Sequence, residues 1–397
     1  MVITEVIRKK AAKRIIGHIQ GKEQGPTMVF FGGIHGNEPS GVDALREVFK
    51  EFEAHPISVK GSMYGIQGNM PALLQKQRFL ARDLNRLWTK PEIERIKALA
   101  KDQRMPEDKE LLELLELLNA ILENETGPFY FIDFHTTSSR TLPFITINDA
   151  MINRKFSKLF PVPIILGIEE YLEGPLLSYI NTKGYLSLGF ESGQHFTEEA
   201  RINSVAFIWL SLQYSGFLKE AHVASEVDHF SQLQSAARHN RNFYEVIERH
   251  GLEPEDKFSM KSGFESFSKI EKNTLLASHN GKTILASQSG ILFMPLYQTL
   301  GGEGFFIVRR IPKSILRISA FVRKIKADRF LTLLPGVSWA DASRERLMVN
   351  LKVARFFSKA FFHLMGYRNR VVDKTHILMN NREKTAKNEM YEDSHWY

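Results

Sequence analysis

Two histidines and two glutamates of this chain directly follow apolar, strand-like segments. His35 and Glu38 lie in GGIHGNEPSG, after the apolar run TMVFFGG, and His135 ends the run FIDFH. Glu191 ends the run YLSLGFE. Imidazole and carboxylate groups are common zinc ligands, and open α/β sheets bind ligands at the carboxyl ends of their strands. His35, Glu38 and His135 are therefore candidate metal ligands, and three ligands would leave a fourth position for water, as in catalytic zinc sites.

Each of these signals also has a purely structural interpretation. A His-x-x-Glu pair is usually two solvent-exposed side chains, and a histidine at the end of a buried strand is usually hydrogen-bonded within the core. Glu191 could equally be a surface carboxylate at a strand exit. The metal hypothesis depends on the segments occurring together.

A further polar segment, ARDLNRLW, could recognise a carboxylate. Asp83, Asn85 and Arg86 lie there among apolar neighbours, and Arg78 lies just upstream. Guanidinium groups bind carboxylates with two parallel hydrogen bonds, which suits substrate recognition. The alternative is a hydrogen-bond cluster that only fixes the loop.

The elements that must position these residues alternate between strand-like and helix-like patterns. We predict strands at 27–33, 58–67, 129–136, 143–148 and 185–191, and helices from 41 and from 197. The leucines between 111 and 118 are expected to form the apolar side of another helix. This alternation predicts an α/β domain in which helices flank a central sheet.

The sequence pattern changes twice further along the chain. Glycine-punctuated short strands follow residue 250 and predict hairpins in a small β-domain, and a basic, largely helical segment follows residue 310. We therefore predict a catalytic domain at 1–250, a small β-domain at 251–310 and a C-terminal extension at 311–397.

The C-terminal extension predicts an amphipathic helix that starts near Ser338 and Asp341. Six apolar residues fall on one face of this helix and four basic residues on the rest: Leu347, Leu351, Ala354, Phe357, Phe361 and Leu364, with Arg346, Lys352, Arg355 and Lys359. Such a helix can lie on anionic lipid, but packing of its apolar face on the same protein is the favoured alternative.

Composition narrows the possible classes of protein. The 397 residues are 43% hydrophobic and 25% charged, which is typical of a folded chain, and no run reaches the ~18 apolar residues of a membrane span. The absence of cysteine excludes disulfides and thiolate ligands, and the first twenty residues lack the apolar core of a secretory signal. We therefore expect a cytoplasmic protein.

The net charge of +8 is concentrated in one segment. Residues 311–370 hold 13 lysines and arginines against three acidic residues, whereas 1–310 has a net charge of −1. No nucleic-acid-binding motif accompanies this charge. We therefore expect no nucleic-acid partner.

Taken together, the polar segments resemble the succinylglutamate desuccinylase and aspartoacylase family of zinc hydrolases, which is related to zinc carboxypeptidases. The matching motifs are G-x-H-G-N-E at His35 and Glu38, D-L-N-R at 83–86, D-x-H at 133–135 and the late Glu191. The resemblance covers about 1–310, where GEGFF resembles the C-terminal domain of bacterial members. It implies a zinc carboxypeptidase-like mixed sheet flanked by helices.

The resemblance also implies how the reacting groups would be arranged. His35, Glu38 and His135 would bind one zinc ion per chain. Glu191 would act first as general base and then as general acid. Arg78 would help to polarise the scissile carbonyl.

Four further positions acquire expected roles in the same way. Asn85 and Arg86 would hold a carboxylate of the substrate. Asp83 and Asp133 would support the residues that contact the metal, Asp133 by orienting a ligand such as His135.

The expected function is therefore a zinc-dependent amidohydrolase that removes an acyl group from an N-acyl amino acid or a related small amide bearing a carboxylate. A zinc carboxypeptidase acting on peptide C-termini is the nearest alternative, and a non-catalytic binding protein that has kept the fold is another. The expected partner is a small N-acylated molecule or a short peptide. No membrane span is expected, only a weak possibility of membrane-surface contact through the C-terminal extension, and the oligomeric state is left open.

This chain departs from the aspartoacylases at two positions. These enzymes hold the amino acid partly with an arginine ten residues before the late glutamate, where this chain has Asn181, and with a tyrosine where it has Phe305 or Phe306. The missing guanidinium and hydroxyl predict that the amine part of the substrate is not aspartate.

Overall fold

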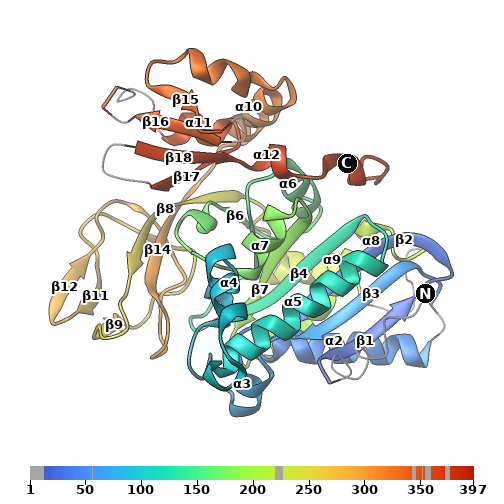
Figure 1. The fold of residues 1–397 in the computed structure, drawn as a ribbon. Coiled ribbons are helices and arrows are strands. Elements are labelled where there is room, and N and C mark those ends of the chain that lie inside the picture. The colour runs from blue at the N-terminus through green and yellow to red at the C-terminus, as the bar shows by residue number, and fades with distance from the viewer. Residues whose placement is uncertain are drawn as a thin grey trace.

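A computed structural model describes residues 13–55, 57–219, 227–341, 346–350, 352–353, 359–371 and 376–397. Within these residues, the main feature is a mixed sheet of eleven strands in the order β1-β3-β2-β4-β7-β5-β6-β8-β14-β13-β10 (Figure 1). Its strands are β1 (Ile15–Gln20), β2 (Glu23–Gly32), β3 (Lys60–Gln67), β4 (Phe129–Thr137), β5 (Phe144–Ile147), β6 (Ile164–Leu166), β7 (Leu186–Gln194), β8 (Phe243–Gly251), β10 (Ser268–Ile270), β13 (Gly290–Phe293) and β14 (Glu303–Arg310).

The middle of this sheet is parallel. β2 pairs in parallel with β3 and β4, and β4 pairs in parallel with β7. β5 turns antiparallel against β7 and continues the sheet through β6 to β8. Because parallel neighbours end at the same edge, the segments that follow β2, β4 and β7 are brought together there.

Helices cover both faces of the sheet, and each face has its own hydrophobic core. In β2, Met28 and Phe30 point into one core while Val29 and Phe31 point into the other, as the alternation of side chains in a strand requires. The first core is completed by α2 (Ser40–Ala54), α6 (Met151–Ser157), α8 (Glu198–Ser215) and α9 (His229–Ala236). The second is completed by α4 (Lys90–Ala98), α5 (Pro106–Asn124) and α7 (Leu176–Thr182).

The predicted leucine-rich helix is α5. Leu111, Leu114, Leu115 and Leu118 are buried against the sheet, and Leu112 packs at the edge of the same core. Between β3 and α5 the chain also forms α3 (Met70–Gln75) and the short 3-10 helices η1 (Leu84–Arg86) and η2 (Lys101–Gln103). The prediction of a mixed sheet flanked by helices is confirmed.

The predicted hairpins after residue 250 are present. β11 (Leu275–His279) forms a three-stranded sheet with β12 (Lys282–Leu285) and β9 (Phe258–Met260), and β13 pairs with β14. β8, β14, β13 and β10 extend the large sheet beyond β6. The domain boundary near residue 250 stays a prediction.

The C-terminal extension combines helices with a sheet. A four-stranded antiparallel sheet has the order β15-β16-β18-β17. Its strands are β15 (Val337–Trp339), β16 (Arg346–Asn350), β17 (Tyr367–Val371) and β18 (His376–Asn381). The helices around it are α10 (Lys313–Lys324), η4 (Ala327–Leu333), α11 (Lys359–Leu364), α12 (Arg382–Thr385) and η5 (Asn388–Tyr391).

The predicted amphipathic helix from Ser338 onward is therefore wrong. Ser338 lies in β15 and Leu347 in β16, and α11 at 359–364 is the helical part of the predicted span that the structure describes. Leu351, Ala354, Arg355 and Phe357 lie outside the described residues. The segment 346–350 alternates between buried and less buried positions, and pairing with β18, far along the sequence, decides its conformation over the local helical spacing.

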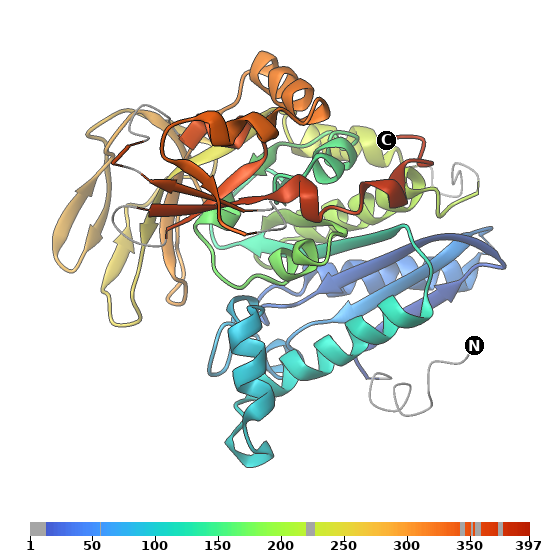
Figure 2. The same cartoon turned by 45° about the horizontal axis from the view of Figure 1, so that its top comes forward.

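The last residues return to the main body (Figure 2). The Tyr391 hydroxyl donates to the Phe129 carbonyl at 2.6 Å and accepts the Leu186 N–H at 2.9 Å. The ring of Trp396 packs against Tyr130 and Phe156. The C-terminus is thus built into the core beside β4 and β7.

Candidate metal and catalytic site

Four of the predicted site residues meet at the carboxyl edge of the parallel strands. His35 and Glu38 follow β2, His135 lies in β4, and Glu191 lies in β7. His135 stands opposite Glu191 in the parallel pair, so their side chains leave the sheet on the same face. All four side chains are buried and line one cavity.

Glycines let the loop after β2 lie close to its neighbours. A Cβ on Gly36 would lie 2.1 Å from the carbonyl carbon of Ala72, so no larger residue fits without movement of the backbone. The Gly36 N–H donates to the Arg78 carbonyl at 3.1 Å. This contact holds the Arg78 segment beside His35 and Glu38.

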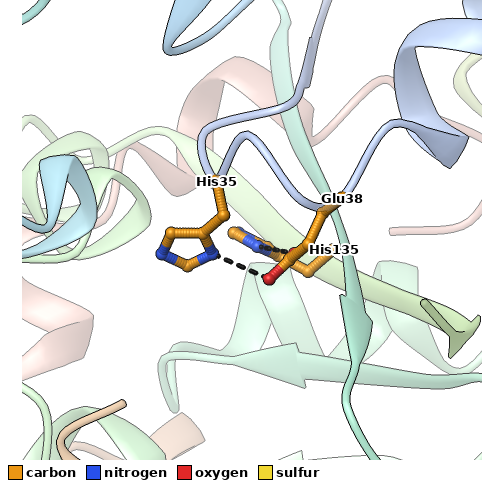
Figure 3. Close-up of side chains that lie close together, drawn as sticks. All are labelled: His35, Glu38 and His135. Carbon is orange, nitrogen blue, oxygen red and sulfur yellow. Dashed lines mark hydrogen bonds and ion pairs between the residues drawn. The ribbon is translucent and has the colours of Figure 1, made fainter. Parts of the chain in front are cut away.

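The Glu38 carboxylate lies between two imidazoles (Figure 3). Its Oε1 is 3.0 Å from His35 Nδ1, and its Oε2 is 3.0 Å from His135 Nδ1. The Thr136 N–H also donates to Oε2 at 3.0 Å. One ligand atom from each of the three side chains lies within 4.8 Å of the others, close enough to share one metal ion.

Carboxylates hold the outer nitrogen of both imidazoles. His35 Nε2 is 3.0 Å from Asp83 Oδ1, and His135 Nε2 is 2.7 Å from Asp133 Oδ2. Burial alone would raise the pKa of Asp83, but His35 and Arg78 outweigh it and hold that pKa well below its ordinary value. An imidazole whose outer N–H is held by a carboxylate presents its inner nitrogen as a ligand. The buried nitrogen and oxygen donors therefore fit a divalent ion such as zinc.

Arg78 borders this group. Its Nη2 is 3.0 Å from Asp83 Oδ2, and its Nη1 is 3.5 Å from Glu38 Oε1. Burial opposes the charged form, but Asp83 and Glu38 raise the pKa of Arg78, so the guanidinium stays protonated. The structure thus places the Arg78 guanidinium, a fixed positive charge, beside the three candidate metal ligands.

Asn85 and Arg86 also line the cavity, but each already has a partner. Asn85 Oδ1 accepts the Leu176 N–H at 2.9 Å. Arg86 Nη2 is 3.2 Å from Glu303 Oε2, whose other oxygen is 3.3 Å from Arg249 Nη2. A substrate carboxylate that binds Arg86 therefore competes with Glu303.

Glu191 differs from the other carboxylates. Its Oε2 is buried and has no hydrogen-bond partner among the residues that the structure describes. Burial raises the pKa of Glu191 to about 8, although His135 opposes the shift. A carboxyl group with a pKa near neutrality can accept and release a proton under ordinary conditions.

Several cavity residues were missed by the sequence analysis. His195 lies in the quoted segment GFESGQHF, and its Nδ1 is 2.7 Å from the Thr136 hydroxyl while its Nε2 is 3.2 Å from Gln298 Oε1. Glu303 lies in the quoted GEGFF but received no role. His195 could have been found from the sequence, because it lies four residues after Glu191. The Arg86–Glu303 contact could not, because it joins residues far apart in the sequence.

The two positions that depart from aspartoacylases lie in different surroundings. Asn181 in α7 accepts a hydrogen bond from Asn153 and donates to the Leu177 carbonyl. Phe306 lines the cavity, whereas Phe305 stacks on His250. The apolar part of the cavity wall comprises Ile147, Ile168, Leu172, Pro175, Leu177, Met294, Pro295, Leu296 and Phe306.

Comparison with known proteins gives a family match for part of the chain. Residues 24–167 match the family described as Succinylglutamate desuccinylase/Aspartoacylase catalytic domain. A succinylglutamate desuccinylase from Photorhabdus laumondii is 30% identical over 77 residues, which are 19% of this chain. The match spans about a quarter (24%) of that relative's length.

Solved structures share the fold over a larger part of the chain. A succinylglutamate desuccinylase/aspartoacylase from Rhodobacter sphaeroides has a TM-score of 0.53 at 15% identity, covering 75% of this chain and 88% of that one. The ectoine utilization protein EutE (DoeB) from Ruegeria pomeroyi has a TM-score of 0.52 at 18% identity, covering 74% and 88%. At these identities the likeness concerns the fold.

Proposed function

We propose that this chain, whose residues 24–167 match the Succinylglutamate desuccinylase/Aspartoacylase catalytic domain, is a metal-dependent hydrolase that cleaves the amide bond of a small N-acyl amino acid or related amide. One arrangement carries the proposal: the buried His35, Glu38 and His135 share a cavity with the buried Glu191. A closed structural zinc site would instead have four protein ligands.

His35, Glu38 and His135 would hold one zinc ion. Bound zinc polarises a carbonyl and lowers the pKa of a water ligand to about 7. Asp83 and Asp133 keep the outer nitrogens of the two imidazoles engaged, so the inner nitrogens are presented toward Glu38.

Glu191 would move the proton. Its Oε2, which has no hydrogen-bond partner among the described residues, would accept a proton from the attacking water. As the water oxygen bonds to the acyl carbon and the carbon–nitrogen bond breaks, the same carboxyl would return the proton to the leaving nitrogen. Glu191 would thus act first as the general base and then as the general acid.

Arg78 would stabilise the negative charge that develops on the acyl oxygen. It is held by Asp83, so little reorganisation is needed when that charge appears. Asn85 and Arg86 would face the carboxylate of the substrate, as the family resemblance implies. Since Glu303 already neutralises Arg86, and Asn181 stands in place of the family's arginine, we expect one carboxylate at most to be accommodated.

The apolar wall around Leu172, Leu177 and Phe306 supports the same expectation. Burying an apolar substituent there is favourable, whereas a second carboxylate would be desolvated without a cationic partner. An N-acyl compound with an apolar amine part and a single carboxylate fits best. N-acetylaspartate should be a poor substrate.

The composition of the chain, which has no cysteine, remains the basis for expecting a cytoplasmic protein.

The test combines metal analysis with product analysis. Elemental analysis should find about one zinc per wild-type chain and little in His135→Ala. Mass spectrometry after incubation with N-acyl amino acids and short peptides should detect deacylated amines. Release of C-terminal amino acids from the peptides instead would favour the carboxypeptidase, and a wild type that neither contains nor takes up zinc would refute the proposal.

A further inference from the structure

The helix α10 turns a set of large apolar side chains to solvent. Ile315, Ile318, Phe321 and Ile325 are 40%, 49%, 62% and 50% exposed, and their spacing of three or four residues places them on one helical face. Phe330 and Leu333 in the following η4 are 60% and 78% exposed. We call these six residues the α10 apolar face.

The opposite side of α10 is firmly held. Leu316 packs on the main hydrophobic core, and Ser319 is buried and donates to the Leu364 carbonyl at 2.8 Å. The Arg323 side chain is 2% exposed and is paired with Asp149 at 2.9 Å and Glu383 at 2.8 Å. These contacts fix the rotation of α10 about its own axis. The α10 apolar face therefore points to solvent.

Five exposed cations flank this face, three along one edge of α10 and two in the residues that follow it: Lys313, Arg317, Lys324, Lys326 and Arg329. The single acidic residue between 313 and 333 is Asp328, and it accepts a hydrogen bond from the Tyr367 hydroxyl at 3.1 Å while pairing with Lys384. The surface therefore combines apolar side chains with a positive rim.

We propose that the α10 apolar face docks on an anionic lipid surface, with its apolar side chains entering the headgroup region and the five cations contacting lipid phosphates. An amphipathic helix with Phe and Ile on one side and Lys and Arg along the edge of that side has the composition of an interfacial anchor. No helix of the described residues is apolar and long enough to pass through a bilayer.

Charge favours lipid over a second copy of this chain. A symmetric interface would bring two sets of these five cations together at one boundary, and this concentration of like charge opposes association. An anionic bilayer neutralises all five together. The arrangement also agrees with the position of α10 at the outer edge of the molecule, on the C-terminal extension (Figure 1).

The experiment is vesicle flotation with the full chain. Vesicles of phosphatidylcholine with about 30 mol% phosphatidylglycerol at about 0.1 M salt should carry the protein upward, and pure phosphatidylcholine should not. Leu333→Ser should weaken the apparent affinity roughly tenfold, because one apolar side chain no longer enters the lipid. Leu74→Ser, which changes an 86% exposed leucine in α3, is the matched control and should bind like wild type.

A second pair of variants tests the contribution of the five cations. Lys313→Gln/Lys324→Gln/Lys326→Gln should lose most binding to the anionic vesicles, whereas Lys269→Gln/Lys272→Gln/Lys282→Gln, changing three exposed lysines of the β-strand region, should not. Circular dichroism and melting curves verify that all variants are folded. Absence of flotation with anionic vesicles, or equal losses in the paired variants, would overturn the proposal. A wild type that instead dimerises in a Leu333-dependent way without binding vesicles would overturn it in favour of a second copy.

Discussion

Glu191 is the residue on which the proposed chemistry depends most. It is buried, lines the same cavity as the three candidate metal ligands, and has an oxygen without a hydrogen-bond partner among the described residues. Burying a carboxyl group without an ion pair costs stability, which a structural role would not explain. A proton-transfer role does explain it. Two measurements separate these interpretations.

The first prediction concerns turnover. Glu191→Gln keeps the size and burial of the side chain but cannot accept a proton, so kcat should fall by roughly 10² to 10⁴. Zinc content measured by elemental analysis should be unchanged, because the residue is not one of the three donors. If the variant hydrolyses an identified substrate at nearly the wild-type rate, Glu191 is not the base.

The second prediction concerns the pH dependence of stability in the metal-free protein. The pKa of Glu191 is raised to about 8 in the folded chain, above its ordinary value of 4.5. The folded state therefore holds a proton that the unfolded state has lost, and stability should decrease as the pH rises from 4.5 to 8. A pKa difference of this size corresponds to at most about 5 kcal/mol.

Glutamine has no such penalty, so Glu191→Gln should melt at a higher temperature than wild type at pH ~8.5 and at a similar temperature at pH ~5, both after metal removal by chelation. Glu199→Gln, an exposed carboxyl in α8, is the control and should show no pH-dependent gain. Equal melting temperatures of the Glu191 variant and wild type at the higher pH would contradict the raised pKa.

At the scale of elements, the strand-end motifs could be predicted and the distant pairings could not. His35, Glu38, His135 and Glu191 each follow a short apolar run, and such runs predict strands whose ends meet in a parallel sheet. The structure confirms that they meet, while their chemical roles stay predictions. The segment of β16 was assigned to a helix because the spacing of its apolar residues fits both periods, and its pairing with β15 and β18 decides for the strand.

The contact between η1 and β14 is another pairing invisible to local patterns, and it supports the third prediction. Glu303 neutralises Arg86 across 3.2 Å, so Glu303→Gln should free the guanidinium for a substrate carboxylate. The KM for N-acetylaspartate should fall roughly tenfold, corresponding to one charge-assisted hydrogen bond. Arg86→Gln should raise the KM of every carboxylate-bearing substrate.

Arg249→Gln is the control for this prediction. It removes the other partner of Glu303 and leaves the Arg86 contact in place, so the KM for N-acetylaspartate should not fall. A KM for N-acetylaspartate that is unchanged or higher in Glu303→Gln would show that Glu303 does not restrict access to Arg86.

At the scale of the whole molecule, the C-terminal extension is part of the structure that supports the site. The motifs in the sequence resemble the family over about 1–310, which would suggest that the later residues are dispensable. However, Tyr391 bridges Phe129 at the start of β4 and Leu186 at the start of β7. His135 and Glu191 lie further along these same two strands, so the last residues of the chain help to hold the strands in register.

The fourth prediction tests this coupling. Tyr391→Phe removes the hydroxyl and leaves the buried Leu186 N–H without its acceptor, which should lower the free energy of unfolding by about 1 to 3 kcal/mol in urea denaturation. Tyr297→Phe is the control, because the Tyr297 side chain is 40% exposed and water can replace the partners of its hydroxyl. Its effect should stay within about 0.5 kcal/mol.

A chain ending at residue 386 loses Tyr391 and Trp396 together and exposes the core around Tyr130, so its zinc content should fall with its stability. Full zinc binding and wild-type stability in that shortened chain would show that the extension does not support the site.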